Sequence, residues 1–235
     1  ISVQSQWVEN LLQQVNSTAH YYHTRILLRN NFYTANPWSY KKTNSPIIFS
    51  SCAAAVSYKG IHVLLKSIAI LKKEYPEIKL HLAGNIMVGN KFKDGYSIFL
   101  EKLIKKYNLQ SNVVMLGSLD EYSIIKELQT CSVCVVPSFI ETYCLAFAEA
   151  MIIGTPTVTS YTGAMPELAI HEKETLFYNS LDYRNAASYI SQLIKDQTLA
   201  ERISKNARER RLSENDPQLV LKTQLDIYKS ILHEL

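Results

Sequence analysis

The sequence predicts an α/β protein built on a doubly wound parallel sheet, and three observations support this class. Short apolar segments alternate with longer segments in which apolar residues recur at helical spacing. The short segments are continuously apolar, as in strands that are buried on both faces. The chain has 235 residues, of which 47% are hydrophobic and 20% charged, a composition that supports a core and excludes disorder.

The first 45 residues precede this alternation. Apolar residues recur at helical spacing over 4–15, which predicts a helix, and the aromatic residues of 19–25 suit a strand. Residues 30–45 are rich in Asn, Ser and Lys and show no period, so a linker or hinge is expected there, with 37–45 as its main part.

The alternation itself begins at residue 46. Strands are expected at 46–51, 78–84, 112–117, 132–138 and 156–160, with a further short strand at 176–179. Helices are expected at 59–75, 96–109, 120–131, 144–154, 182–196, 198–213 and 217–234. Helices that connect consecutive buried strands indicate a Rossmann-like parallel sheet with helices on both faces.

Charge and hydropathy exclude several classes of function. The formal net charge of +4 is too small to indicate a nucleic-acid-binding protein without a concentrated basic patch. The basic run Arg202–Arg211 includes acids and is interpreted as a solvated helix face, with a peripheral membrane contact as the alternative. No apolar run approaches the roughly 18 residues of a membrane-spanning helix, so a cytoplasmic protein, at most at the inner membrane surface, is expected. The chain begins with Ile and not with Met, which suggests a piece of a longer polypeptide.

Four cysteines include one Cys-x-x-Cys spacing, formed by Cys131 and Cys134. Both lie in an expected buried strand, where residues three apart point to opposite faces. A structural zinc site needs a second pair or two nearby histidines, and a redox pair needs a strand that opens into a helix. Neither context is present, so reduced core thiols are expected, and no metal.

In an open parallel sheet, ligands bind at the carboxyl ends of the strands, near the switch in strand order. The loops at these ends are residues 50–59, 84–95, 117–120, 138–145 and 160–167. They contain no Gly-x-Gly-x-x-Gly and no Gly-Lys-Ser/Thr, which disfavours a nicotinamide dehydrogenase and a P-loop enzyme. Helix amino ends could hold an anion instead, because their free N–H groups and positive dipole end attract negative charge, with a lysine in support.

The loop that follows the fourth strand carries the most informative motif. The segment from Pro137 to Glu167 reads PSFIETYCLAFAEAMIIGTPTVTSYTGAMPE, in which seven residues separate Glu141 from Glu149. With its Pro-Ser, Glu-Ala-Met, Gly-Thr-Pro and Pro-Glu elements at these offsets, it resembles the donor-binding segment of retaining glycosyltransferases of family 4, which have the two-Rossmann-domain (GT-B) plan. The segments SYKGIHVLLKSIAIL, IKLHLAGN and NVVMLGSL are similar to further parts of that family.

The resemblance implies a domain organisation. Residues 46–214 are expected to form the nucleotide-sugar-binding Rossmann-like domain, the C-terminal domain of a GT-B enzyme. Residues 1–36 resemble the end of the N-terminal, acceptor-binding domain, and 215–235 resemble the C-terminal helix that returns toward it. The rest of the N-terminal domain of the same polypeptide is then an expected partner.

Helix geometry separates the roles of the two glutamates. Eight residues of helix span about 12 Å, too far for the ~5.5 Å carboxylate pair of a retaining glycosidase. Glu141 can therefore face the transferred sugar while Glu149 accepts hydrogen bonds from ribose hydroxyls. Lys59, at a helix start, would neutralise the diphosphate as it leaves. The family assigns these roles in the same way.

The resemblance also implies further donor contacts and a reaction. Besides Lys59 and Glu149, the expected donor-binding residues are Gly84, Asn85, Leu119, Thr142, Tyr143, Cys144 and Leu145. The implied reaction transfers a hexose from a UDP-, GDP- or ADP-sugar to a glycan or lipid-linked acceptor. The anomeric configuration is retained, with no metal or other cofactor.

Two departures from the family pattern concern the phosphates. The family usually pairs the lysine with an arginine a few residues earlier, but no Arg occurs between Arg29 and Arg184. Two alternatives follow: Ser50, Ser51, Lys91 or Lys93 compensates for the missing arginine, or the donor binds weakly. The family also often has glycines where Thr142 and Cys144 stand. The side chains of Thr142 and Cys144 narrow the space through which the phosphates reach the backbone, but the backbone N–H donors remain.

Two other functions are weighed against this hypothesis. A sugar-nucleotide epimerase shares the architecture and would release a changed sugar without an acceptor. A non-catalytic doubly wound domain predicts no nucleotide affinity, although the strand PIIFSS is not followed by the acid cluster of a phospho-accepting domain.

Overall fold

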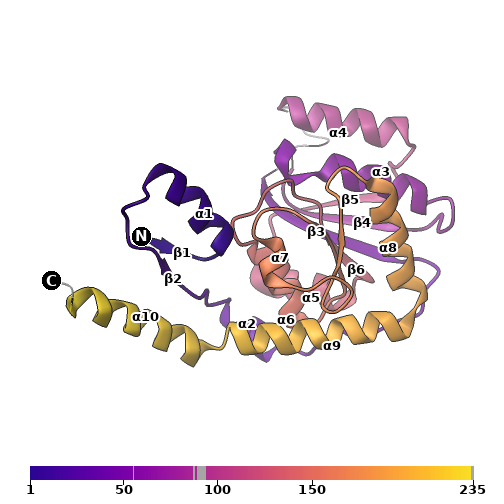
Figure 1. Ribbon diagram of the computed structural model, residues 1–235. Coiled ribbons are helices and arrows are strands. Elements are labelled where there is room, and N and C mark those ends of the chain that lie inside the picture. The colour runs from indigo at the N-terminus through magenta and orange to yellow at the C-terminus, as the bar shows by residue number, and fades with distance from the viewer. Residues whose placement is uncertain (55, 87, 89–93, 234–235) are drawn as a thin grey trace.

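Six parallel strands form the central sheet of the computed structural model (Figure 1), which describes residues 1–54, 56–86, 88 and 94–233. The strands are β3 (Ile47–Ala54), β4 (Lys79–Asn85), β5 (Val113–Gly117), β6 (Val133–Val136), β7 (Thr157–Ser160) and β8 (Leu176–Tyr178). They lie in the order β5-β4-β3-β6-β7-β8, which confirms the predicted α/β doubly wound class.

The strand order places a switch point between β3 and β6. The chain enters the sheet at β3 and builds outward through β4 to β5. It then crosses to β6, which pairs with β3 at Ile48 and Phe49, and builds outward in the other direction to β8. The loops after β3 and β6 thus leave neighbouring strands in different directions, and ligands bind at such a point in sheets of this type.

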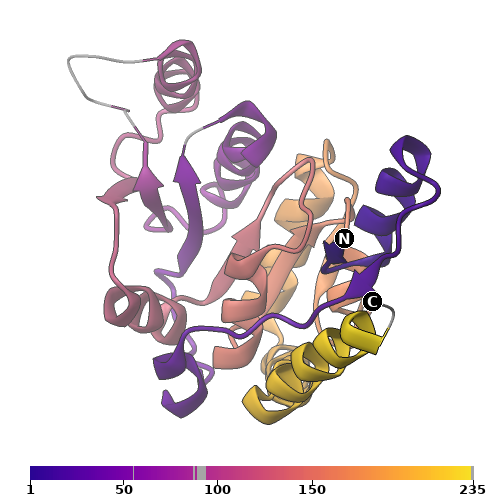
Figure 2. The ribbon, with the colours of Figure 1, turned by 90° about the vertical axis from the view of Figure 1, so that its left-hand side faces the viewer.

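Helices cover both faces of the sheet (Figures 1 and 2). The covering helices are α3 (Ile61–Leu71), α4 (Gly95–Lys106), α5 (Glu121–Thr130), α6 (Leu145–Ile153), α8 (Tyr183–Lys195) and α9 (Gln197–Glu214). On one face α3 packs against α4 and α8, and on the other α6 packs against α5 and α9. α6 is buried from Phe147 to Ile153, and its residues there are apolar except for Glu149.

The first residues form a small module beside the sheet. β1 (Ser2–Val3) and β2 (Tyr22–His23) pair in parallel, and α1 (Gln6–Val15) connects them. The strand expected over 19–25 is therefore only two residues long, because its partner strand is equally short.

Residues 30–45 contain more structure than their lack of a period suggests. α2 (Asn30–Thr34) is a short helix, and the side chains of Phe32 and Trp38 are buried. The indole N–H of Trp38 donates to the carbonyl of Cys131 at 2.8 Å. Two separate aromatic anchors hold this segment in place, and two residues are too few to create a period.

Three further elements complete the fold: the 3₁₀ turn η1 (Ser57–Lys59), α7 (Met165–Leu168) and α10 (Pro217–His233). α10 extends beyond the sheet on the same side of the molecule as the N-terminal module (Figures 1 and 2). It carries an exposed apolar stripe of Leu221, Leu225, Tyr228 and Leu232. In the part of the chain that the structure describes, every helix is too short or too polar to span a bilayer.

The basic run on α9 is only partly a solvated face. Arg202 and Lys205 are exposed as predicted, but Arg208 and Arg210 are half-buried and Arg211 is 1% exposed. Arg208 donates to a backbone carbonyl at the end of α6. The prediction is therefore wrong for these three arginines. Arg208 contacts α6, along which α9 packs, whereas Arg210 and Arg211 pair with Glu214 at the end of α9 itself.

Candidate functional site

A cleft of about 690 Å³ opens at the carboxyl ends of the strands, at the switch point. Its walls come from the ends of β3, β4 and β6, the loop after β5, η1 and the loop that leads into α6. Gln4 and Ile26 of the N-terminal module complete one side. The cleft therefore lies where a parallel sheet with this strand order binds its ligand.

Most of the predicted site residues line this cleft. Those that do are Lys59, Gly84, Leu119, Glu141, Thr142, Tyr143, Cys144 and Leu145. Ser50 and Ser51, named as substitutes for the missing arginine, also line it. Lys91 and Lys93 lie outside the described residues. Asn85, at the end of β4, and Glu149, in the second turn of α6, are not among the lining residues.

The contribution of the N-terminal module to the cleft was not predicted from the sequence. Nothing in the sequence around Gln4 or Ile26 distinguishes these two residues, because their role depends on how the module packs. Ser118, Pro137 and Ser138 also line the cleft. They were not named as donor-binding residues, although Ser118 and Ser138 lie in the predicted loops 117–120 and 138–145, and Pro137 and Ser138 open the most informative motif.

Lys59 and Glu141 form an ion pair inside the cleft, with 2.7 Å between Nζ and Oε1. Their side chains are 23% and 12% exposed, so solvent screens the pair only partly. Burial acts to lower the pKa of Lys59, but the hydrogen bond and charge of Glu141 outweigh it and leave the pKa above its ordinary value. Lys59 is thus a fixed cation. Among the described residues that line the cleft, it is the one basic side chain and Glu141 the one acidic side chain.

Two helices begin at the cleft, and neither has a side-chain cap. α3 follows Gly60 and α6 follows Cys144, and neither residue caps its helix with a side-chain hydrogen bond. The other described helices of eight or more residues do have side-chain caps, which are Ser5 (α1), Asp94 (α4), Asp120 (α5), Asp182 (α8), Asp196 (α9) and Asp216 (α10). Helix amino ends without caps carry unsatisfied N–H groups and a partial positive charge, which suits an anion.

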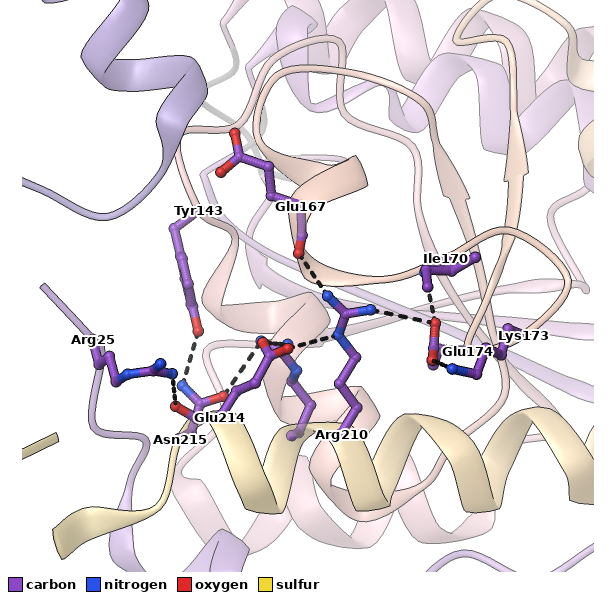
Figure 3. A network of polar contacts seen from close by, with 10 residues as sticks. Arg25, Tyr143, Glu167, Ile170, Lys173, Glu174, Arg210, Glu214 and Asn215 are labelled. Atoms are coloured by element: carbon purple, nitrogen blue, oxygen red, sulfur yellow. Dashed lines mark hydrogen bonds and ion pairs between the residues drawn. The ribbon is translucent and has the colours of Figure 1, made fainter. Parts of the chain in front are cut away.

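The loop from Glu141 to Cys144 is held from several sides. Its first carbonyl, that of Glu141, accepts from the N–H of Ala164 at 2.9 Å. The next, that of Thr142, accepts from the hydroxyl of Ser5 at 3.0 Å. The hydroxyl of Tyr143 accepts from the side-chain amide of Asn215 at 2.9 Å, as Figure 3 shows. The loop is therefore fixed before any ligand binds.

Glu149 is paired with a residue of the N-terminal segment. Its Oε1 accepts a hydrogen bond from Nε of Arg29 at 2.9 Å, and its side chain is 10% exposed. Burial raises the pKa of Glu149 above its ordinary value, although the hydrogen bond and charge of Arg29 partly offset this. Arg29 thus favours the ionised form of the carboxylate, which burial disfavours.

We expect Arg29→Ala to destabilise the protein by about 1–2 kcal/mol at pH 8, because it leaves a buried carboxylate without its hydrogen-bond donor. Solvent already screens part of the pair, since the side chain of Arg29 is 39% exposed. The pKa of Glu149 is raised in the folded state, so near this pKa the folded protein binds more protons than the unfolded chain does. Its stability therefore falls as the pH rises from the unfolded to the folded pKa of Glu149. Removing Arg29 should make stability fall more steeply with pH, so Arg29→Ala should destabilise the protein less at pH 5 than at pH 8. Urea unfolding at both pH values measures this destabilisation. Arg29→Ala in a Glu149→Gln background is the control, and a pH-dependent loss there would contradict the assignment.

The cysteines are free thiols in the structure. Cys131, Cys134 and Cys144 are buried and Cys52 is half-buried. Burial raises the pKa of Cys52 to about 11, and its half-buried thiol lines the cleft in its neutral form. The described residues contain no group of three or more His, Cys, Asp or Glu side chains placed to bind a metal ion.

Comparison with known sequences identifies relatives of the chain. The profile of the family Glycosyl transferases group 1 matches residues 33–210. An uncharacterised glycosyltransferase of Bacillus subtilis, YqgM, is 32% identical over 179 residues, which cover 76% of this chain and 47% of that protein. Glycogen synthase of Mycobacterium tuberculosis is 25% identical over 170 residues, which cover 72% of this chain and 39% of the synthase. The chain thus spans about half the length, or less, of these curated relatives.

Solved structures share the fold. Sucrose-phosphate synthase from Thermosynechococcus elongatus superposes with a TM-score of 0.81 and 22% identity, over 100% of this chain and 58% of that one. Anabaena HepE, in complex with UDP, superposes with a TM-score of 0.78 and 18% identity, over 100% of this chain and 63% of that one. These similarities show a GT-B Rossmann-like fold. Because the family profile covers most of the sequence, the chain belongs to the glycosyl transferases group 1 family.

Proposed function

We propose that this chain is the donor-binding part of a retaining glycosyltransferase of family 4, and that its cleft binds a nucleoside diphosphate sugar. The observation that carries the proposal is the pair of uncapped helix amino ends, which meet the fixed cation Lys59 in one cleft at the switch point. A diphosphate supplies the negative charge and the acceptor oxygens that these groups need.

The diphosphate lies between α3 and α6 in this proposal. Backbone N–H groups of Thr142 to Leu145 donate to its oxygens, and the ammonium of Lys59 stabilises the charge that develops as the nucleotide leaves. Glu141 accepts hydrogen bonds from hydroxyls of the transferred hexose. Its carboxylate is already paired with Lys59, so the sugar and the phosphate ends of the donor meet at this pair.

The nucleoside lies on the side of Leu119 and Ile124, where the cleft wall is apolar. The proposed ribose contact of Glu149 requires its second carboxylate oxygen, because Oε1 accepts from Arg29. The proposal includes no metal ion. The one described acidic side chain in the lining, Glu141, is already paired with Lys59, and the cation and helix ends supply the positive charge.

The acceptor in this proposal is a glycan or a lipid-linked sugar, bound largely by a further N-terminal domain of the same polypeptide in the cytoplasm. Two facts support it. The chain covers about half of its curated relatives. The capsular polysaccharide biosynthesis glycosyltransferase CapM of Staphylococcus aureus is 23% identical over 83% of the chain. Family membership does not favour an epimerase or a non-catalytic domain.

Calorimetric titration of the chain with UDP, GDP and ADP tests the proposal. We expect saturable binding of at least one nucleotide, with UDP as the first candidate, because HepE structures contain UDP or UDP-glucose. The diphosphate should bind at least about tenfold more tightly than its nucleoside, since charge-assisted hydrogen bonds are lost without it. The chain alone should turn over little or no donor. Equal affinity for nucleoside and diphosphate would reject the proposed role of the helix ends.

A further inference from the structure

Glu167 holds the amino end of α1. Its two carboxylate oxygens accept hydrogen bonds from the backbone N–H groups of Gln6 and Trp7, both at 2.8 Å. These are N–H groups of the first helical turn, which have no partner inside a helix. A carboxylate there also interacts favourably with the positive end of the helix dipole. Glu167 belongs to α7 of the sheet domain, so this contact joins the sheet domain to the N-terminal module.

Ser5 connects the same helix end to the donor loop. Its hydroxyl oxygen accepts from the N–H of Val8 at 3.2 Å and donates to the carbonyl of Thr142 at 3.0 Å. Ser5 is 3% exposed, so this bridge is shielded from water. The residue before it, Gln4, lines the cleft. A shift of α1 would therefore move both a wall of the cleft and a carbonyl of the donor loop.

Glu167 is itself held in place by α9. Its backbone carbonyl accepts from the guanidinium of Arg210 at 3.0 Å. Figure 3 shows its carboxylate pointing away from this contact, to the side on which α1 lies. The main chain of Glu167 is therefore held by Arg210, while its carboxylate contacts the amino end of α1. Glu167 lines a small cavity next to the cleft rather than the cleft itself.

We propose that Glu167 is a positioning residue, which fixes the amino end of α1 over the cleft and, through Ser5, fixes the loop Glu141–Cys144 that binds the donor. It touches neither the nucleotide nor the sugar. Its effect on the donor rests on the proposed function, whereas its effect on the loop does not. The role follows from two independent contacts, the paired bonds to α1 and the bridge from Ser5 to Thr142.

The test compares Glu167→Ala, Glu167→Gln and the matched control Glu172→Ala in the full 235-residue chain. The side chain of Glu172 is 72% exposed and close in sequence to Glu167. Hydrogen exchange is measured at the amides of Gln6 and Trp7 and across residues 141–146, without nucleotide. UDP affinity is measured by calorimetry, and urea unfolding reports global stability.

Glu167→Ala should accelerate exchange at Gln6 and Trp7 by about tenfold or more, as expected when charge-assisted hydrogen bonds are lost. It should also accelerate exchange across 141–146 and weaken UDP binding about three- to tenfold. Glu167→Gln keeps one acceptor oxygen and should fall between Glu167→Ala and the unaltered chain, while Glu172→Ala should change nothing.

Faster exchange at Gln6 and Trp7 with no change across 141–146 would overturn the proposal, because the helix end would then be held without consequence for the loop. Unchanged exchange at all these sites would overturn it as well. If the unaltered chain binds none of UDP, GDP and ADP, the proposed function fails, and the exchange data still decide the role of Glu167. Uniformly faster exchange with a general loss of stability would assign Glu167 to folding and reject positioning.

Discussion

Replacing Gly60 with alanine is expected to lower the free energy of unfolding by about 3 kcal/mol. Gly60 has a φ of 69°, a left-handed conformation that costs other residues about 1–2 kcal/mol. A Cβ at this position would lie 1.9 Å from the carbonyl oxygen of Pro137. Relieving this clash must displace backbone at the end of β6, and overpacking of this kind typically costs about 1–3 kcal/mol. Urea unfolding measures the loss.

Substitutions at two other glycines separate the cost of the left-handed backbone conformation from the cost of the clash. Gly117 has a φ of 67° but nothing within 4 Å of the position of an added Cβ, so Gly117→Ala should lose only about 1 kcal/mol. Gly95, at the start of α4, has open space and no positive φ, so Gly95→Ala should be neutral or slightly stabilising. If Gly60→Ala costs no more than Gly117→Ala, the loops after β3 and β6 are not in the close contact described.

Lys59→Ala should weaken UDP binding by about 10- to 100-fold, the range that corresponds to loss of one charged hydrogen bond. The effect has two sources. The variant removes the one basic side chain among the described lining residues, and it leaves the carboxylate of Glu141 unpaired beside the phosphates. Calorimetry measures the affinity. Lys205→Ala is the control, because it removes the same charge from a side chain that is 75% exposed on α9.

A second variant separates the two ends of the donor. Glu141→Gln removes the carboxylate but leaves Lys59, so UDP should bind with equal or higher affinity. A UDP-sugar should then lose its advantage over UDP, because the amide replaces the carboxylate that is proposed to accept the sugar hydroxyls. If Glu141→Gln weakens UDP as much as Lys59→Ala does, the carboxylate serves the phosphate end or the loop, and the proposed division of roles is wrong.

The fold was predictable because it depends on local patterns. Continuous apolar strands and amphipathic helices fixed the order of elements from β3 to β8, and the strand ends then indicated the cleft. Lys59 and Glu141 could be named because they lie in the loops that follow β3 and β6, within motifs that resemble the donor-binding parts of a glycosyltransferase family. The ion pair between them could not, because it depends on how the loops after β3 and β6 approach each other.

Contacts with the N-terminal segment were beyond the reach of sequence patterns. The pairing of Arg29 with Glu149 joins residues 120 positions apart, and no local period records it. The burial of Arg211 runs against the usual exposure of arginine, and only the packing of α9 explains it. The structure of residues 30–34 was missed for the same reason, since Phe32 is buried by neighbours that are distant in sequence.

The missing caps on α3 and α6 have a consequence for how such a site can change over evolution. A peptide group is present whatever side chain is attached to it, so substitutions cannot easily remove these donors. Thr142 and Cys144 can therefore carry side chains while the path of the main chain is kept. Cys144 does so with a φ of 81°. Anion binding by backbone N–H groups can therefore persist among relatives whose side chains have largely diverged.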